Sequence, residues 1–538
     1  MWPQREMSMK NLAVVNITGI SPLAGESVFA GPSALERVRD WASSIPGASG
    51  TVFLADPETS VPRGTLELDF SSTSESPESF SVQQAAVIRK EKWTEKTLIE
   101  SFITLSRFFG DNPENRGVEA FFYTWGDFPL IDRDITENLW KLHYKYDAEY
   151  SFADGYPLGL APEILSSKLP EKLLPLAQNR DNPVARDSLF EILRQDINAF
   201  DVETLLSPED LRMDRGSISC DTRRNKNMAE ALHDAGGRDA ESLCRVIPEN
   251  RVLLRDLPAY FPIQITDHCP QACSYCPFPE YSGDPRAGKR FMEPDIFESL
   301  CRRIIDFAGD AVIGLSLLGE PASHPEIGKL IRSALAAGKD NPGNRVLIET
   351  SGIGWDEKLL EELSRESGEG RLMWIVSLDA SDPELYRQLR GEGQEEAERT
   401  GRLLARLFGS FSWVQAVRMK ENEEHLEDFY RKWKAEDVQV IIQKYDSYAS
   451  FLPEKQPADL SPLERFPCWH LKRDMPVLID GSVPVCREDL GRRDVLGNVF
   501  EEDFEKVWNA GDALHVKHTA GEYPGPCGDC DEYYCFNF

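Results

Sequence analysis

The segment DHCPQACSYCPFP, residues 267–279, decides how the rest of the sequence is interpreted. It holds Cys269, Cys273 and Cys276 in a Cys-x3-Cys-x2-Cys spacing, directly after an apolar run that predicts a buried β-strand. Three thiolates on one loop can bind three irons of a [4Fe–4S] cluster and leave the fourth iron open to a small molecule. The same thiolates, completed by adjacent His268, could instead hold a zinc ion.

The middle of the chain, residues 250–448, alternates strand-like and helix-like patterns and predicts a partial (β/α)6 barrel. The expected strands are residues 261–267, 311–319, 345–352, 373–380, 413–420 and 438–446, and the expected helices are residues 295–309, 325–338, 356–367, 397–409 and 423–436. Active sites of barrels lie at the carboxyl ends of the strands. The three-cysteine loop follows the first strand, and this position favours a cluster over zinc.

Two further blocks flank the predicted barrel. Residues 1–249 alternate short β-rich runs with amphipathic stretches, which predicts a mostly parallel sheet covered by helices. Residues 449–538 have little regular pattern and hold five cysteines, namely Cys468, Cys486, Cys527, Cys530 and Cys535. A segment that can bury so little apolar surface needs another source of stability, and a metal cluster supplies it.

Composition narrows the possible functions. The formal net charge is −31 and the isoelectric point is about 4.8, which exclude nucleic acid or an anionic membrane surface as the main partner. Eleven cysteines are too few for a disulfide scaffold, and eight of them fall into the two groups above, which points to metal in a reducing compartment. Without an apolar run of about 18 residues or a secretory signal, we expect a cytoplasmic protein with no membrane span.

The Cys-x3-Cys-x-Tyr-Cys loop, with Tyr275 before the last cysteine, resembles the radical S-adenosylmethionine (radical SAM) superfamily. The turn Gly319-Glu320-Pro321 resembles the segment of that family that receives the amino group of S-adenosylmethionine, with Leu318 where the family has its first glycine. The resemblance also implies that Ser377 and Asp379 contact the ribose and that Arg418 pairs with the methionine carboxylate. Each of these positions lies at the end of a predicted strand or in the loop that follows it.

The C-terminal block resembles the SPASM extension of the same superfamily. Its pattern runs from Cys468-Trp469 through Asp480-Gly481-x4-Cys486 to Cys527-x2-Cys530. The resemblance implies one auxiliary [4Fe–4S] cluster bound by Cys468, Cys486, Cys527 and Cys530, with Cys535 spare or substituting. A zinc ribbon is the alternative for the same cysteines.

The first block resembles a Rossmann-like nucleotidyltransferase domain. The resemblance rests on TWGDFPLID around Asp127 and on CDT with Asp221, which would hold a divalent ion such as Mg²⁺ against nucleotide phosphates. The usual glycine-rich basic loop is replaced by GISPLAGESVFAGPS, residues 19–33, which has no lysine or arginine. A degenerate or substrate-holding domain is therefore expected more than a working transferase.

Over its whole length the chain is similar to the spiro-SPASM proteins, which join these three parts. The resemblance implies reductive cleavage of S-adenosylmethionine to a 5′-deoxyadenosyl radical, with a ferredoxin or flavodoxin as electron donor. The substrate classes suggested are a peptide and a nucleotide-linked sugar or polyol. Two alternative functions remain. The protein could be a nucleotidyltransferase with regulatory iron–sulfur domains or a non-catalytic iron–sulfur electron carrier.

Overall fold

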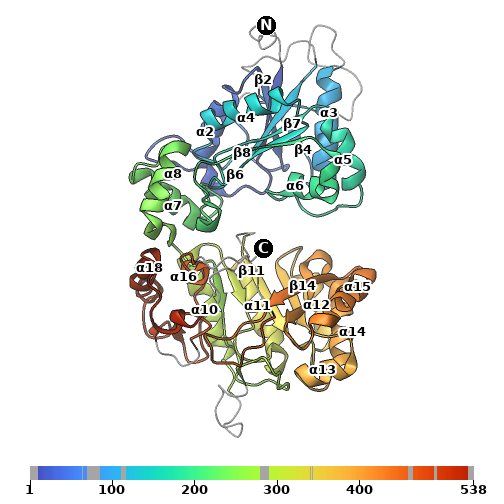
Figure 1. Cartoon of the computed structure of the whole chain (residues 1–538), viewed down its shortest axis with the longest axis vertical. Coiled ribbons are helices and arrows are strands. Elements are labelled where there is room, and N and C mark those ends of the chain that lie inside the picture. Colours follow the sequence, from blue (N-terminus) through green and yellow to red (C-terminus); the bar gives the residue numbers. More distant parts are fainter. Residues whose placement is uncertain are drawn as a thin grey trace. The chain divides into compact units, whose positions relative to one another are not determined.

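The structure is a computed structural model that describes residues 10–62, 65–68, 85–110, 117–278, 290–339, 341, 343–457, 465–489 and 494–530. The chain divides into two compact units, Met1–Leu254 and Arg255–Phe538. Each unit combines a β-sheet with covering helices (Figure 1), which confirms the predicted α/β class. In the described part of the chain, no helix combines the length and apolar character needed to cross a bilayer.

The first unit is built on an eight-stranded sheet in the order β3-β4-β2-β1-β5-β7-β6-β8. Its strands are β1 (Asn11–Asn16), β2 (Ala48–Ala55), β3 (Leu66–Glu67), β4 (Ala85–Arg89), β5 (Ala120–Trp125), β6 (Tyr150–Asp154), β7 (Glu163–Ser166) and β8 (Val202–Leu206). The pairings are parallel except at β7, which runs antiparallel to both β5 and β6. The sequence patterns did not indicate this reversal.

Helices cover both faces of this first sheet. Strand β1 is buried along its whole length, as expected for a central strand with helices on both sides. One apolar cluster joins the sheet to α3 (Glu95–Gly110), α5 (Leu169–Ala177) and α6 (Ser188–Leu193). The other face packs against α2 (Ala34–Ala42) and α4 (Arg133–Lys145), and the unit ends in α7 (Arg223–Asp234) and α8 (Ala240–Glu249).

The second unit holds a six-stranded sheet whose strands follow one another in chain order, all parallel. All six expected strand runs form strands: β9 (Tyr260–Pro262), β10 (Val312–Gly314), β11 (Arg345–Thr350), β12 (Leu372–Ser377), β13 (Ser412–Arg418) and β14 (Gln439–Lys444). Each is shorter than its apolar run, because the last residues of the run leave the sheet and enter the loops at its carboxyl edge.

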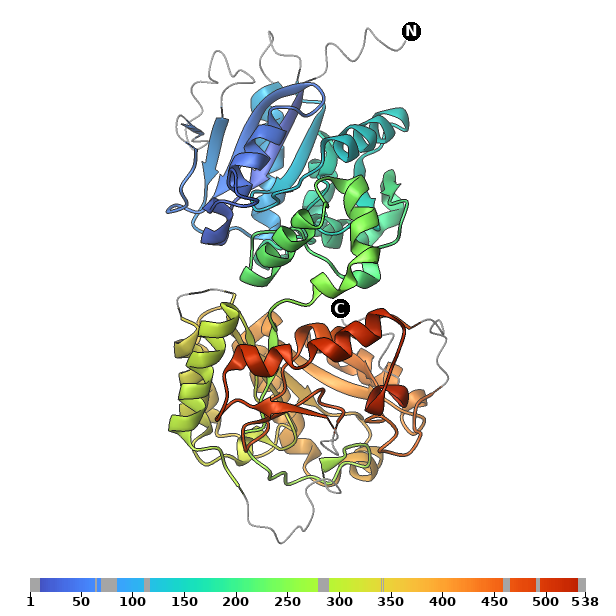
Figure 2. The same cartoon turned by 90° about the vertical axis from the view of Figure 1, so that its left-hand side faces the viewer.

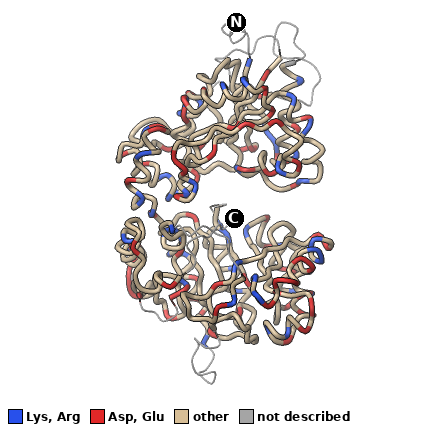
Figure 3. The backbone as a smooth tube through the Cα atoms, viewed as in Figure 1, with Lys and Arg blue, Asp and Glu red and all other residues tan. Residues whose placement is uncertain are grey.

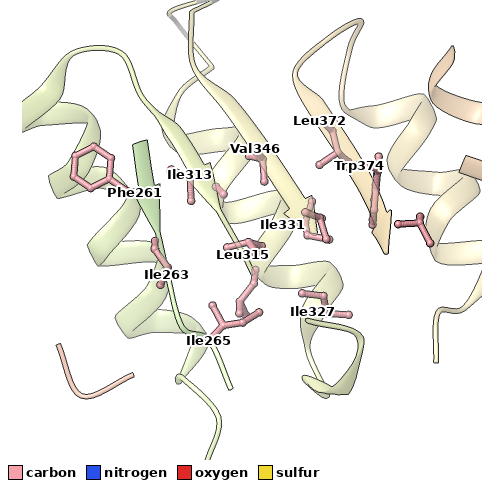
Figure 4. Packing of buried hydrophobic residues seen from close by; sticks show 14 of the residues in the cluster. Phe261, Ile263, Ile265, Ile313, Leu315, Ile327, Ile331, Val346, Leu372 and Trp374 are labelled. Atoms are coloured by element: carbon pink, nitrogen blue, oxygen red, sulfur yellow. The ribbon is translucent and has the colours of Figure 1, made fainter. Parts of the chain in front are cut away.

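The helices of the second unit lie between these strands, as the β-then-α pattern predicts. They are α10 (Pro294–Ala308), α11 (Ile327–Ala337), α12 (Glu357–Glu366), α14 (Gln394–Phe408) and α15 (Leu426–Ala435), with an additional short helix α13 (Pro383–Arg390) that the sequence patterns did not indicate. Buried side chains of successive strands and of α11 form one apolar core (Figure 4).

The C-terminal tail shares this core. The backbone of residues 473–477 runs along the free edge of β9, where Val477 N–H donates to Pro262 O at 2.9 Å. The tail elements are α16 (Trp469–Arg473), β15 (Ser482–Pro484), β16 (Val495–Asn498), α17 (Phe504–Asn509) and α18 (Asp512–Thr519). Helix α17, red in Figure 2, packs against α10, with the Phe307 and Phe504 rings 5.8 Å apart.

Candidate iron–sulfur and S-adenosylmethionine site

The three-cysteine loop leaves the sheet at the carboxyl end of β9. Its backbone is fixed at two points, where His268 N–H donates to the Thr266 hydroxyl at 3.1 Å and Ser274 N–H donates to Leu389 O at 2.8 Å. Burial raises the pKa of the Cys269 thiol to about 12 and that of Cys276 to about 11. Thiols with pKa values this far above 7 stay protonated at neutral pH unless a metal replaces the proton.

A buried ion pair stands beside this loop. The Arg390 guanidinium at the end of α13 binds the Asp379 carboxylate, with Nη1 and Oδ2 2.5 Å apart, and the Tyr275 hydroxyl contacts both groups. The second Asp379 oxygen accepts a hydrogen bond from Val417 N–H at 2.7 Å. Asp379 therefore joins the cluster loop to the ends of β12 and β13.

Arg390 also holds the loop directly. Its Nε and Nη2 donate to Gln271 Oε1 at 3.2 and 2.8 Å, and Gln271 lies between the first two cysteines. The arginine is only 4% exposed, and its charge lowers the pKa of the Cys273 thiol, although burial raises that pKa more. Arg390 was not among the predicted site residues. One signal was present, because Arg390 follows Tyr386 by four residues and so shares the buried face of α13.

The Gly319-Glu320-Pro321 turn lies against the start of the cluster loop. Glu320 N–H donates to His268 O at 2.9 Å. The Glu320 carboxylate is buried, which raises its pKa, and it accepts hydrogen bonds from the Thr350 hydroxyl at 2.6 Å and Ser351 N–H at 2.7 Å. The carboxylate is thus engaged in holding the end of β11.

Backbone geometry explains why glycine suits this turn. Leu318 adopts φ of +51°, a left-handed conformation that costs a bulky residue energy and that glycine adopts freely. A Cβ atom on Gly319 would stand 2.4 Å from Thr266 O, so only glycine lets the two loops approach this closely.

The two remaining predicted S-adenosylmethionine contacts end their strands as expected. Ser377 is the last residue of β12 and is half-buried. Arg418 is the last residue of β13, where its exposed guanidinium pairs with Glu423, with Nη2 and Oε1 2.6 Å apart. The cofactor contacts of Tyr275, the 319–321 turn, Ser377, Asp379 and Arg418 stay predictions.

In the tail, four cysteines from distant parts of the sequence line one hollow: Cys468, Cys486, Cys527 and Cys530. Burial raises the pKa of Cys468 to about 12 and also raises that of Cys486 and Cys527. Arg465 donates from Nη2 to Cys527 O at 2.7 Å and Cys530 O at 3.1 Å, which fixes the last cysteine pair. Cys535 lies outside the described residues.

Two histidines line the same hollow, His470 on α16 and His518 on α18. His518 on α18 is 3% exposed, and its Nε2 is buried without a hydrogen-bond partner among the described residues. Four thiols and an unsatisfied polar nitrogen around one hollow fit an iron–sulfur cluster, whose sulfur atoms accept hydrogen bonds. Within the described ranges, no three Cys, His, Asp or Glu side chains are arranged for a single metal ion. Ligands of one cluster bind different irons, so they need not converge on a single point.

In the first unit, Asp127 and Asp221 both contact a third residue, Arg186. Arg186 Nη2 lies 2.5 Å from Asp127 Oδ2 and 3.3 Å from Asp221 Oδ2. Burial raises the pKa of Asp127, whereas Arg186 lowers that of Asp221 against its burial. The guanidinium also lies over the Trp125 and Phe128 rings, at 5.0 and 4.8 Å from their centroids.

Two family models match the second unit. The radical SAM superfamily matches residues 263–432, and the SPASM iron–sulfur cluster-binding domain matches residues 468–531. An uncharacterized protein of Treponema pallidum (strain Nichols) is 38% identical over 363 residues, which are 65% of this chain and 98% of that protein. A second uncharacterized protein of the same strain is 39% identical over 77 residues, 14% of this chain and 35% of that protein.

Solved structures are similar at lower identity. Streptococcus suis SuiB bound to S-adenosylmethionine is 16% identical with a TM-score of 0.40, over 50% of this chain and 70% of SuiB. Native anSMEcpe with bound AdoMet is 17% identical with a TM-score of 0.39, over 49% of this chain and 84% of that chain. BtrN in complex with AdoMet and 2-DOIA is 17% identical with a TM-score of 0.33, over 52% of this chain and 94% of BtrN.

A parallel α/β sheet with a three-cysteine loop at its carboxyl edge, joined to a four-cysteine hollow, defines a class of iron–sulfur protein. Within that class, the matched domains identify the second unit: residues 263–432 form a domain of the radical SAM superfamily, and residues 468–531 form a SPASM domain. These domains imply S-adenosylmethionine and iron–sulfur clusters as cofactors.

Proposed function

We propose that the chain is a radical SAM enzyme of the spiro-SPASM type that abstracts a hydrogen atom from its substrate. The observation that carries this proposal is the anchored loop of Cys269, Cys273 and Cys276 after β9. When bound there, the [4Fe–4S] cluster supplies an open iron and one electron for reductive cleavage of S-adenosylmethionine to methionine and a 5′-deoxyadenosyl radical. On this proposal the six-stranded sheet is the partial (β/α)6 barrel of the family.

The residues of this chain would bind and orient the cofactor. Because the Glu320 carboxylate is already engaged, we assign the amino group of S-adenosylmethionine to main-chain carbonyls of the 319–321 turn. The Ser377 hydroxyl would face the ribose, whereas the Asp379 carboxylate, already engaged by Arg390 and Val417 N–H, would hold the loop together with the Tyr275 hydroxyl. Arg418 would exchange its exposed pairing with Glu423 for the methionine carboxylate, which a planar guanidinium binds with two parallel hydrogen bonds.

The tail would hold one auxiliary [4Fe–4S] cluster through Cys468, Cys486, Cys527 and Cys530. Their shared hollow supports this assignment, and Cys535 is kept as a substitute ligand. We propose that this cluster relays electrons or binds substrate, and that a cytoplasmic ferredoxin or flavodoxin supplies the electrons.

Anaerobic reconstitution tests the proposal. We expect about eight irons per chain, since two [4Fe–4S] clusters bind, and 5′-deoxyadenosine after reduction in the presence of S-adenosylmethionine. Cys273→Ala should remove about half of the iron and all 5′-deoxyadenosine. Cys301→Ala, a buried cysteine of α10 outside both groups, is the matched control and should keep both. Zinc without iron, or a fully loaded protein that forms no 5′-deoxyadenosine, would contradict the proposal, and the second result would favour an electron carrier.

For the substrate we propose a peptide or a nucleotide-linked sugar or polyol. The net charge of −31 suits a basic peptide, and Figure 3 displays basic residues dispersed among acidic ones along both units. Formation of 5′-deoxyadenosine above the rate without substrate, measured with each class in turn, would separate the two.

Nucleotidyl transfer by the first unit is the second candidate function, favoured by the meeting of Asp127 and Asp221. It predicts pyrophosphate release from a nucleoside triphosphate with Mg²⁺, lost in Asp127→Ala and retained in Cys273→Ala. Arg186 argues against a divalent ion at this site. A guanidinium between the two carboxylates already supplies the positive charge that the ion would bring. We therefore propose a degenerate, Rossmann-like nucleotidyltransferase fold that holds substrate without Mg²⁺.

A further inference from the structure

We infer that His518 donates a hydrogen bond through Nε2 to a sulfur atom of the auxiliary cluster and thereby raises the reduction potential of that cluster. The inference rests on the proposed tail cluster and goes beyond it, because it assigns a tuning role to a residue outside the cysteine pattern. The starting observation is that His518 shares a hollow with four cysteines while its Nε2 has no partner among the described residues.

The other ring nitrogen determines the position of the proton. The backbone N–H of Cys468 donates to His518 Nδ1 at 3.4 Å, so Nδ1 acts as an acceptor. A neutral imidazole with an accepting Nδ1 carries its proton on Nε2, which makes Nε2 a donor. A buried N–H donor without a partner costs stability, and a cluster sulfur in the hollow would supply the missing acceptor.

The ring is held in one orientation by its surroundings. The Tyr523 ring meets the imidazole edge to face, with centroids 4.7 Å apart and planes at 70°. The Arg465 guanidinium lies over the Tyr523 ring, 4.0 Å from its centroid, and its contacts to Cys527 O and Cys530 O join the stack to the cysteines. The orientation of Nε2 is therefore fixed by the segments that carry the proposed ligands.

The direction of the effect follows from charge. Reduction adds an electron to the cluster and makes its sulfur atoms better acceptors, so a fixed N–H donor stabilises the reduced state more than the oxidised state. Removing the donor should shift the midpoint potential to a more negative value without changing the number of irons bound.

Helix α18 provides a matched control. His515 precedes His518 by three residues and is equally buried at 3% exposed, but it is not among the residues that line the hollow. Replacing either histidine removes one buried imidazole from the same helix. Only replacement of His518 should act on the cluster.

The experiment uses the full chain with Cys269, Cys273 and Cys276 changed to Ala, so that iron reports on the tail alone. Potentiometric titration followed by electron paramagnetic resonance is compared for this parent, His518→Leu, His518→Gln and His515→Leu. We expect a more negative midpoint for His518→Leu, partial return toward the parent for His518→Gln, whose amide is again a donor, and no shift for His515→Leu. An unshifted midpoint in iron-loaded His518→Leu would overturn the inference.

A spectroscopic measurement detects the hydrogen bond itself. With ¹⁵N-labelled histidine, the His518 imidazole should give a weak nitrogen coupling in pulsed spectra of the reduced cluster, and this coupling should be lost in His518→Gln, which keeps the second histidine of the hollow, His470. Strong coupling, as from a nitrogen bound to iron, or no coupling would each overturn the inference. Absence of iron from the parent, by contrast, would show that the proposed tail cluster itself is wrong.

Discussion

At the scale of single residues, buried charges define both candidate sites. Arg390 and Asp379 are 4% and 1% exposed, so each depends on the other for compensation of its charge. Removing one partner of such a pair leaves an uncompensated charge in the interior and typically costs about 3–5 kcal/mol. Burying the pair costs free energy. Its contacts to Tyr275 and Gln271 fix the position of the cluster loop.

Replacing Arg390 should therefore disturb the loop specifically. We expect Arg390→Gln to lower the free energy of unfolding by about 3 kcal/mol and to reduce iron bound by the barrel while the tail keeps its iron. Arg387→Gln, on the same helix but with an exposed side chain paired to Glu392, should change neither quantity appreciably. Thermal unfolding and iron quantitation check this, and equal behaviour of the two variants would argue against an anchoring role.

A second single-residue prediction concerns Glu163 in the first unit. Burial raises the pKa of its carboxyl from an ordinary 4.5 to about 7, and the Tyr150 hydroxyl donates to it. The folded state thus favours the protonated form, so this contribution to stability is full below about pH 4.5 and is lost as the pH rises through 7.

The variant Glu163→Gln removes that pH dependence while keeping a carbonyl acceptor for Tyr150. At pH 8 it should be more stable than the natural chain by about 3 kcal/mol, and at pH 4 the two should be nearly equal. Thermal unfolding midpoints at both pH values measure the difference. A variant less stable at pH 8 would show that the ionised carboxylate is well accommodated.

At the scale of elements, the carboxyl ends of successive strands are held together by their loops rather than by the sheet. The 319–321 turn after β10 binds the loop after β9 through Glu320 N–H and the end of β11 through its carboxylate. Asp379 after β12 reaches β13 through Val417. The short strands leave these loops free to form the site, and the contacts between loops set its geometry.

Gly319 is the point where two of these loops come closest. Gly319→Ala would place a methyl group 2.4 Å from Thr266 O, and the backbone must move to relieve it, at a cost of about 2 kcal/mol or more. Gly354→Ala is the control for the effect of positive φ alone, because its nearest atom would be 3.7 Å away. We expect only Gly319→Ala to lower S-adenosylmethionine binding, measured by equilibrium dialysis against the iron-loaded protein.

At the scale of the whole molecule, the chain has separate apolar cores in its two compact units. All the proposed cluster ligands among the described residues belong to the second unit. In that unit the tail contributes Val477, Val483, Phe504 and Trp508 to the same core as the strands of the six-stranded sheet. Arg255 reinforces the contact, with its guanidinium 3.6 Å from the Trp508 ring centroid.

Removal of iron should therefore destabilise one unit only. In calorimetry of the full chain we expect two transitions, of which chelation of iron lowers one and leaves the other unchanged, because a ligand stabilises only the folded part that binds it. Asp127→Asn, a change in the first unit, should instead affect the other transition. A single transition that responds to both changes would contradict independent cores.

The sequence alone predicted more of the fold than of the candidate site. The α/β class, the six parallel strands of the second unit and the helices between them followed from periodicity, because burial imposes its period on the residues of each element. The three-cysteine group followed from spacing along a short loop, the tail group from its cysteine pattern and family resemblance, and the choice of Asp127 and Asp221 from family resemblance. Helix α13 and the antiparallel strand β7 were missed, because both are short, with eight and four residues.

The sequence by itself thus determined the chemistry available to the protein: which thiols, which turns and which strands carry them. Only the tertiary structure decided which charged and polar side chains lie beside these groups. Arg390 reaches the cluster loop from a helix more than 100 residues later, Arg186 enters between two aspartates, and His518 turns toward four cysteines. Such pairings depend on side chains that meet across folded segments, and no local pattern in the sequence records those distances.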